Sequence, residues 1–181
     1  MADFNIISAD GISLTTIYAP VSQTNPANPE TPGLPFKVGQ YARGANGTMY
    51  MFCLSTAGLA INQACGITES LALASQVSPL AISPTYDASA LTKALADQGC
   101  MFGVAVVAIT ATYYGWVLVS GPAYVTLKNS CLPNVPLYTT ATAGMLDDTS
   151  ASQTRIYGIR ARDTSTASGA AKICWISNPT V

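Results

Sequence analysis

Short stretches of apolar residues, separated by turn residues, make up most of the chain after residue 36. Residues 48–54 (TMYMFCL) place apolar side chains on both faces of a strand, which is typical of a strand buried between two layers. Residues 101–109 (MFGVAVVAI) predict another fully buried strand. Further strands are expected at residues 115–120, 123–127, 136–140, 144–146, 155–162 and 171–177.

Turn signals separate these strands. The Asn-Gly dipeptide at residues 46–47 is the strongest short hairpin signal, and the Gly-Pro dipeptide at residues 121–122 predicts a second turn. One helix is expected at residues 87–96 (DASALTKALA), with Asp87 or Ser89 as its cap. Regular short strands joined by such turns predict an all-β fold, a compact β-barrel or β-sandwich.

The first 35 residues differ from the rest. Residues 3–18 contain two short β-prone stretches around an Asp-Gly dipeptide, and residues 20–35 contain five prolines, which favour an extended polyproline conformation. We therefore divide the chain into an extended N-terminal arm with a short hairpin (residues 1–35) and a barrel or sandwich body (residues 36–181). A leader without a role is the alternative, but residues 3–18 are too apolar for a solvated tail. The side chains expected to bind a partner are Phe4, Ile6, Ile7, Leu14, Ile17 and Tyr18.

Composition argues against an enzyme. The 181 residues include no histidine, eight basic and nine acidic side chains, so a serine or cysteine nucleophile lacks its usual base. A Ser-Lys dyad is formally open, but no lysine lies near a nucleophile motif. Only Asp147 and Asp148 are adjacent acids, and a turn or cap explains them better than a calcium site. We expect no catalytic residues, no cofactor and no metal.

Charge and hydropathy also limit the partners. A net charge of −1 offers no electrostatic footprint for nucleic acid. No signal peptide is evident, and the longest apolar run, residues 101–109, is too short to cross a bilayer as a helix. We expect synthesis in a cytoplasm and no membrane partner.

The five cysteines are interpreted as small buried hydrophobic residues, and one disulfide across neighbouring strands is left open. The cysteines are Cys53, Cys65, Cys100, Cys131 and Cys174.

Two groups of side chains suggest binding surfaces. Residues 113–116 (YYGW) form either a carbohydrate or peptide platform or the cap of a barrel with Trp116 inside, and the flanking apolar strands favour packing. Arg155, Arg160 and Arg162 line either a sheet face suited to an acidic partner or a solvated edge guarded by charge.

Residues 114–127 (YGWVLVSGPAYVTL) and residues 134–149 (NVPLYTTATAGMLDDT) are similar to small head proteins of tailed bacteriophages, the capsid decoration or cement proteins. The resemblance extends loosely over residues 36–177, including the opening of the body at residues 39–50. It implies a β-barrel or β-sandwich outside the shell, commonly trimeric, that clamps neighbouring major capsid subunits against the pressure of packaged DNA. The shared motifs are turns and core strands without active-site residues.

From this resemblance we expect a structural virion protein on the outer capsid surface, synthesised in the host cytoplasm. Its partners would be the major capsid protein and, as a homotrimer, itself. Residues 1–35 match no pattern of that group, so a bridging role for the arm is our own inference. The alternative is a receptor- or glycan-binding module on the phage head or tail that uses Tyr113, Tyr114 and Trp116. A hydrolase with an Asp-based or Ser-Lys site ranks third.

Overall fold

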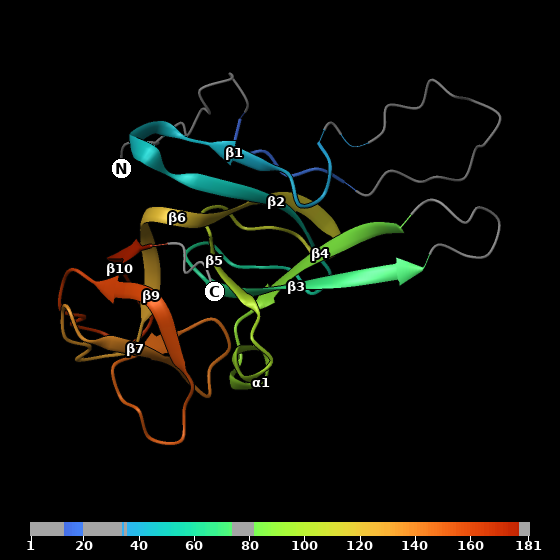
Figure 1. The fold of residues 1–181 in the computed structure, drawn as a ribbon. Helices are drawn as coiled ribbons and strands as arrows, with labels where there is room; N and C mark the ends of the chain where they lie inside the picture. Colours follow the sequence, from blue (N-terminus) through green and yellow to red (C-terminus); the bar gives the residue numbers. More distant parts are fainter. Residues whose placement is uncertain (1–12, 20–33, 35, 74–81, 178–181) are drawn as a thin grey trace, which may run out of the picture.

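The computed structural model describes residues 13–19, 34, 36–73 and 82–177 (Figure 1). They form an all-β protein, which confirms the predicted fold class. In chain order the elements are β1 (Tyr41–Arg43), η1 (Ala45–Gly47), β2 (Met49–Ser55), β3 (Ala64–Leu73), β4 (Ile82–Ala90), α1 (Lys93–Asp97), β5 (Met101–Ala105), β6 (Tyr113–Leu127), β7 (Pro136–Thr139), β8 (Leu146–Asp147), β9 (Arg155–Ala161) and β10 (Ala170–Ile176).

A closed five-stranded barrel forms the first part of the body. Its strands pair in the order β2, β4, β3, β5 and β6, and β6 pairs back with β2 to close the ring. The β2–β6 ladder runs from Met49 opposite Ser120 to Ser55 opposite Tyr113. β1 forms an antiparallel hairpin with β2 through η1, so the turn predicted at residues 46–47 is confirmed.

The interior of this barrel combines larger side chains, among them Met51, Ile67 and Ile109, with several small ones. One core cluster brings together Cys53 of β2, Cys65 of β3, Ala88 of β4 and Val117 of β6. Gly103 of β5 faces the same space, since a Cβ built there would lie 2.5 Å from Cγ1 of Val117. Because a barrel of few strands has room only for side chains that fill it, small residues at these positions allow the ring to close.

The remaining strands build a second ring on the C-terminal half of β6. β6 pairs with β10, β10 with β9, β9 with β7 and β7 with β8. The ring returns to β6 where Leu127 pairs with Leu146 of β8, and the N–H of Lys128 donates to the Leu146 carbonyl over 2.8 Å. Buried side chains that line this ring include Val125, Leu137, Ile159, Cys174 and Ile176.

Both rings share β6, which runs without interruption for 15 residues. The prediction of two strands with a turn at residues 121–122 is wrong, because the chain bends there without leaving the sheet. Gly121 takes a φ of +111°, a conformation open to glycine. Just before this bend the register of β2 against β6 shifts between Met49 and Tyr50, as in a β-bulge. The bend lets β6 exchange β2 for β10 as its partner.

Residues 13–19 pack against the outside of the first barrel. Tyr18 forms an antiparallel bridge with Tyr114 of β6, in which each N–H donates to the opposite carbonyl over 2.8 Å. The Tyr18 ring also lies edge-on to Phe36 and Phe52, with centroids 5.8 and 5.7 Å away. This short segment thus completes an aromatic cluster that covers β2 and β6.

The helix is shorter and begins later than the sequence predicts. Residues 87–90 belong to β4, and α1 spans Lys93–Asp97. Asp87 is held in the strand because its carboxylate accepts hydrogen bonds from the N–H of Thr56 over 3.0 Å and from the Thr56 hydroxyl over 2.8 Å. The cap is Thr92, whose side chain accepts the N–H three residues later.

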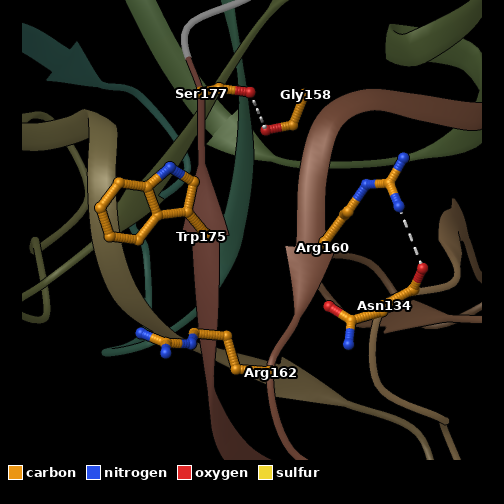
Figure 2. A pocket seen from close by; sticks show the side chains of 6 residues that line it. All are labelled: Asn134, Gly158, Arg160, Arg162, Trp175 and Ser177. Atoms are coloured by element: carbon orange, nitrogen blue, oxygen red, sulfur yellow. Dashed lines mark hydrogen bonds between the residues drawn. The ribbon is translucent and has the colours of Figure 1, made fainter.

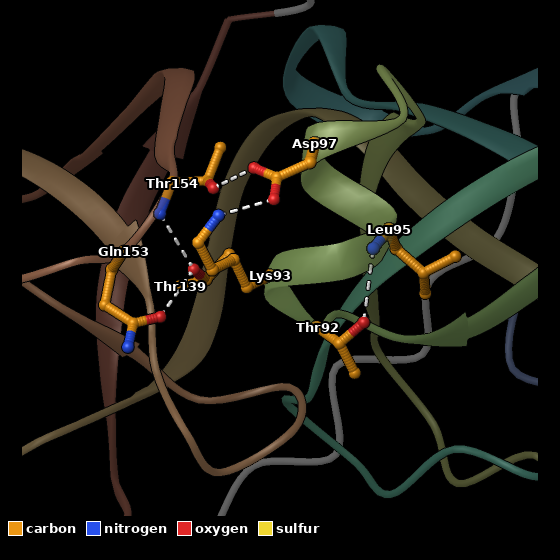
Figure 3. A network of polar contacts seen from close by, with 7 residues as sticks. All are labelled: Thr92, Lys93, Leu95, Asp97, Thr139, Gln153 and Thr154. Carbon is orange, nitrogen blue, oxygen red and sulfur yellow. Dashed lines mark hydrogen bonds and ion pairs between the residues drawn. The ribbon is translucent and has the colours of Figure 1, made fainter.

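A polar network joins α1 to the strands of the second ring (Figure 3). Asp97 pairs with Lys93 and also accepts a hydrogen bond from the Thr154 hydroxyl. The N–H of Thr154 donates to the Thr139 hydroxyl over 3.1 Å, and that hydroxyl donates to Gln153 over 3.0 Å. Hydrogen bonds lower the pKa of the Asp97 carboxyl, the one from Lys93 more than the one from Thr154. The Asp97 carboxylate that links α1 to the second ring is therefore charged at neutral pH.

We expect Gly121→Ala to lower the free energy of unfolding by about 2–3 kcal/mol. A Cβ at this position would lie 2.7 Å from Cγ2 and 3.1 Å from Cα of Thr48, and the positive φ adds strain. Gly47→Ala is the matched control, because its φ is +73° but its Cβ would meet nothing within 4 Å. It should lose only about 1 kcal/mol. Urea unfolding of both variants measures the difference, and equal losses would contradict a close approach of β6 to Thr48.

Candidate functional site

The structure places the described arm residues in the chain's own core. Leu14 has 0% exposure, and Tyr18 packs against the same core cluster. Ile17 is partly buried against the cluster inside the first barrel. In this position Leu14 offers no surface to a partner. The other arm residues predicted to bind a partner lie outside the described residues: Phe4, Ile6 and Ile7.

The aromatic motif at residues 113–116 is not exposed as a platform. Trp116 has 0% exposure, and its ring centroid lies 5.0 Å from that of Phe36 and 5.1 Å from that of Phe52. Tyr114 is partly buried and stacks on Phe52. Packing is therefore the interpretation of this motif that the structure supports, although Trp116 is buried in the aromatic cluster outside the first barrel and not inside it. Trp116 is not accessible to a sugar ring.

All five cysteines are free thiols, so no disulfide joins neighbouring strands. Burial raises the pKa of Cys53 and Cys174 to about 12 and that of Cys131 to about 11. Burial also raises the pKa of Cys65 and of the partly exposed Cys100. Because the thiolate is the form that attacks a substrate or binds a metal, these protonated thiols are poorly suited to either task.

The adjacent carboxylates of Asp147 and Asp148 hold a loop together. Asp147 pairs with Lys128 at 3.4 Å and accepts the N–H of Asp148 over 2.9 Å. Asp148 accepts the N–H of Leu132, also over 2.9 Å. These contacts agree with the turn interpretation of the pair. Across the described parts of the chain, no group of three or more cysteine, aspartate or glutamate side chains could hold a metal ion.

The second ring carries an exposed face on which aromatic side chains and arginines are neighbours. Its central strand β10 lies between β6 and β9. Trp175 of β10 stands opposite Arg160 of β9 and opposite Pro122 of β6, and residues directly opposite one another in antiparallel strands share a face. Trp175 is 50% exposed in spite of this central position. We define the arginine–tryptophan face as Asn134, Arg160, Arg162, Tyr124 and Trp175.

A shallow, open hollow of about 440 Å³ lies in this face (Figure 2). The Arg160 side chain extends away from the indole, and its Nη1 donates to the Asn134 carbonyl over 3.1 Å. The Arg162 side chain runs across β10, and its guanidinium group lies on the same side of that strand as the indole. The residues that line the hollow are Asn134, Gly158, Arg160, Arg162, Trp175 and Ser177.

A bulge in β9 gives these side chains their direction. The register of β7 against β9 shifts between Pro136 and Leu137, and Gly158 takes a φ of +73° within the bulged segment. Ser177 stabilises the bulge, because its N–H donates to the Gly158 carbonyl over 2.8 Å and its hydroxyl donates to the same oxygen over 3.2 Å. After the bulge, Arg160 faces outward beside β10.

The face is cationic. Arg160 and Arg162 are both exposed on it. Arg155 lies on β9 before the bulge and is also exposed, with its guanidinium 5.0 Å from the ring centroid of Tyr157. The two ion pairs found among the described residues involve lysines elsewhere, so none of these arginines has a carboxylate at ion-pair distance there. The arginines therefore offer most of their donors to whatever meets this surface.

The sequence indicated the arginines of this surface but not its tryptophan. In residues 171–177 apolar side chains occupy both sets of alternate positions, so alternation does not show whether Cys174 or Trp175 faces outward. The deciding fact is that β10 is covered on one side only, by the interior of the second ring. Which side of β10 is covered depends on pairing between strands that lie far apart in the sequence.

Comparison of the chain with protein-family models, with curated proteins and with solved structures gives no match. Within the described parts of the chain, no helix combines the length and apolar character needed to span a membrane.

We expect Leu14→Ala to destabilise the protein by about 2–5 kcal/mol, because it leaves a cavity in a fully buried site. Ile61→Ala is the control, since Ile61 is 56% exposed and its loss should cost little. Urea unfolding monitored by circular dichroism measures both. If Leu14→Ala unfolds like the wild type, residues 13–19 do not belong to the core of the free protein.

Proposed function

We propose that this protein is a structural virion protein that binds the outside of a bacteriophage capsid and stabilises contacts between major capsid protein subunits. It is synthesised in the host cytoplasm, assembles as a homotrimer and has the major capsid protein as its partner. The observation that carries the proposal is the arginine–tryptophan face. Tryptophan, tyrosine and arginine are the residue types that dominate binding energy at protein–protein interfaces, and here they stand on a closed ring of strands.

The state of the reactive side chains supports a binding role over catalysis. The thiols have raised pKa values, and Asp87, Asp147 and Asp148 are occupied by local hydrogen bonds. Lys93 pairs with Asp97, so its ammonium group is a poor general base. We therefore assign no catalytic residue and no cofactor to the chain.

The stretches that resemble decoration proteins lie in strands of the body. Residues 114–127 make up nearly all of β6, and residues 134–149 contain β7 and β8. These strands form the shared strand and the closure of the second ring. Because these stretches form strands of the body, we interpret the resemblance as a likeness of fold. The capsid role is proposed on that likeness together with the exposed face.

The proposal is tested by co-sedimentation of the purified protein with heads of the parent phage that lack it. We expect saturable binding at a fixed ratio to capsid subunits, because a decorating protein occupies equivalent sites set by the symmetry of the shell. Heads that already carry the protein are the control and should take up no more. Absence of binding to both expanded and unexpanded heads would overturn the proposal.

The role of the arm is tested by deletion of residues 1–12, which removes Phe4, Ile6 and Ile7. Leu14 and Tyr18 stay in place, so the deletion keeps the core contacts of residues 13–19. We expect binding to heads to weaken about tenfold or more, as for the loss of several apolar contacts. Undiminished binding by this truncated chain would remove the arm from the contact surface.

A further inference from the structure

We propose that the arginine–tryptophan face docks onto an acidic segment of the major capsid protein. Partner carboxylates would bind separately at Arg160 and at Arg162, which border the hollow on opposite sides of β10, and an apolar partner side chain would cover Trp175 and Tyr124. The identity of the partner rests on the proposed function, whereas the chemistry of the segment follows from the face itself.

The local charge favours a carboxylate-bearing partner. From residue 149 to the end of the chain there are four basic residues and one acid, Asp163, although the whole chain has a net charge of −1. The exposed guanidinium groups have no ion-pair partner among the described residues. Arginine binds carboxylates in a planar, two-pronged geometry, so an acidic side chain is the natural occupant of this surface.

The hollow has a suitable form for such a side chain. It is open to solvent, has a volume of about 440 Å³ and is bordered by the indole and the two arginines. Arg160 is already held by its hydrogen bond to the Asn134 carbonyl, which leaves its other N–H groups for a ligand. An arginine held in advance loses less conformational entropy when a partner binds.

The aromatic side chains supply apolar contact next to the charge. Trp175 is 50% exposed and Tyr124 is 53% exposed, on adjacent strands of one sheet. β10 is paired along both edges, so a partner has to meet side chains and is unable to add a strand there. The expected contact is therefore a patch of side chains on a sheet face.

The same observations argue against two other occupants. Within the described parts of the chain, a second copy offers few carboxylates without a partner, since five of the six acids there already accept hydrogen bonds: Glu69, Asp87, Asp97, Asp147 and Asp148. Nucleic acid would meet a chain with a net charge of −1, in which only two exposed arginines belong to this face and the other basic residues are spread over the chain.

The first test compares binding to undecorated heads for full-length variants. We expect Arg160→Gln combined with Arg162→Gln to weaken binding about tenfold or more, and Trp175→Ala to do the same. Lys37→Gln combined with Arg43→Gln is the matched control, because it removes two exposed positive charges at and before β1. Tyr41→Ala, a 47% exposed aromatic residue on β1, is the control for Trp175→Ala.

The second test examines the face without capsids, by tryptophan fluorescence in the presence of a short poly-glutamate peptide at low salt. We expect a change in emission that disappears at high salt and in the Trp175→Phe variant, whose remaining tryptophan, Trp116, is buried. A poly-lysine peptide should cause no change. A DNA oligonucleotide that binds as tightly as poly-glutamate would overturn the assignment of a protein partner.

The outcomes separate the two proposals. If the wild-type protein binds heads and the arginine double variant binds equally well, the docking face is wrong and the decoration role stands. If the wild type binds no head form but responds to poly-glutamate through Trp175, the decoration role is wrong and the acidic specificity of the face stands. If neither binding occurs, both are wrong.

Discussion

The strand β6 is the element on which the rest of the body depends. Its N-terminal half pairs with β2 and closes the first barrel. Its C-terminal half pairs with β10 and, at Leu127, with β8, so the second ring begins and ends on this strand. Neither ring is complete without this strand, so loss of pairing along β6 exposes both interiors. The bend at Gly121 is the local condition for this arrangement, because β6 pairs with β2 as far as Ser120 and with β10 from Gly121 onward.

Two consequences follow for the surface that we assign to binding. The second ring holds β10 between two neighbours, which fixes the backbone under Trp175 and Arg160. The polar network from Asp97 to Thr154 and Thr139 connects this ring to α1, so the two halves of the molecule are joined by more than the shared strand. A face on such a support changes little when it binds, and its affinity depends mainly on side-chain chemistry.

Local pattern was sufficient for one strand with two buried faces and only partly for another, because residues 101–109 were expected to form one buried strand but β5 ends at Ala105. Residues 48–54 were predicted as a strand between layers, and in β2 Phe52 and Cys53 do belong to different core clusters. Prediction failed where distant pairing overrides a local signal. Gly121 and Pro122 look like a turn but pair with β10, and residues 87–90 look helical but complete the ladder with β3.

The candidate site shows the same limit. The sequence indicates that Arg160 and Arg162 share one side of a strand, but their exposure depends on the bulge at Gly158, which interrupts the alternation that starts at Arg155. The position of Trp175 beside Arg160 follows from the register between two strands, and the burial of Leu14 follows from the return of residues 13–19 to the barrel. Both are contacts between segments far apart in the chain, for which spacing along a single sequence carries no signal.

The five thiols inside this fold bear on how the protein ages. Cys53, Cys65, Cys131 and Cys174 have 0% exposure, and their pKa values are raised by burial. Oxidants react with accessible thiolates, so these sulfur atoms are shielded by position and by protonation together. No cross-link has to form for the chain to fold, and few sulfur atoms are exposed to attack afterwards. The fold therefore keeps most of its sulfur atoms away from oxidants without using any of them as a cross-link.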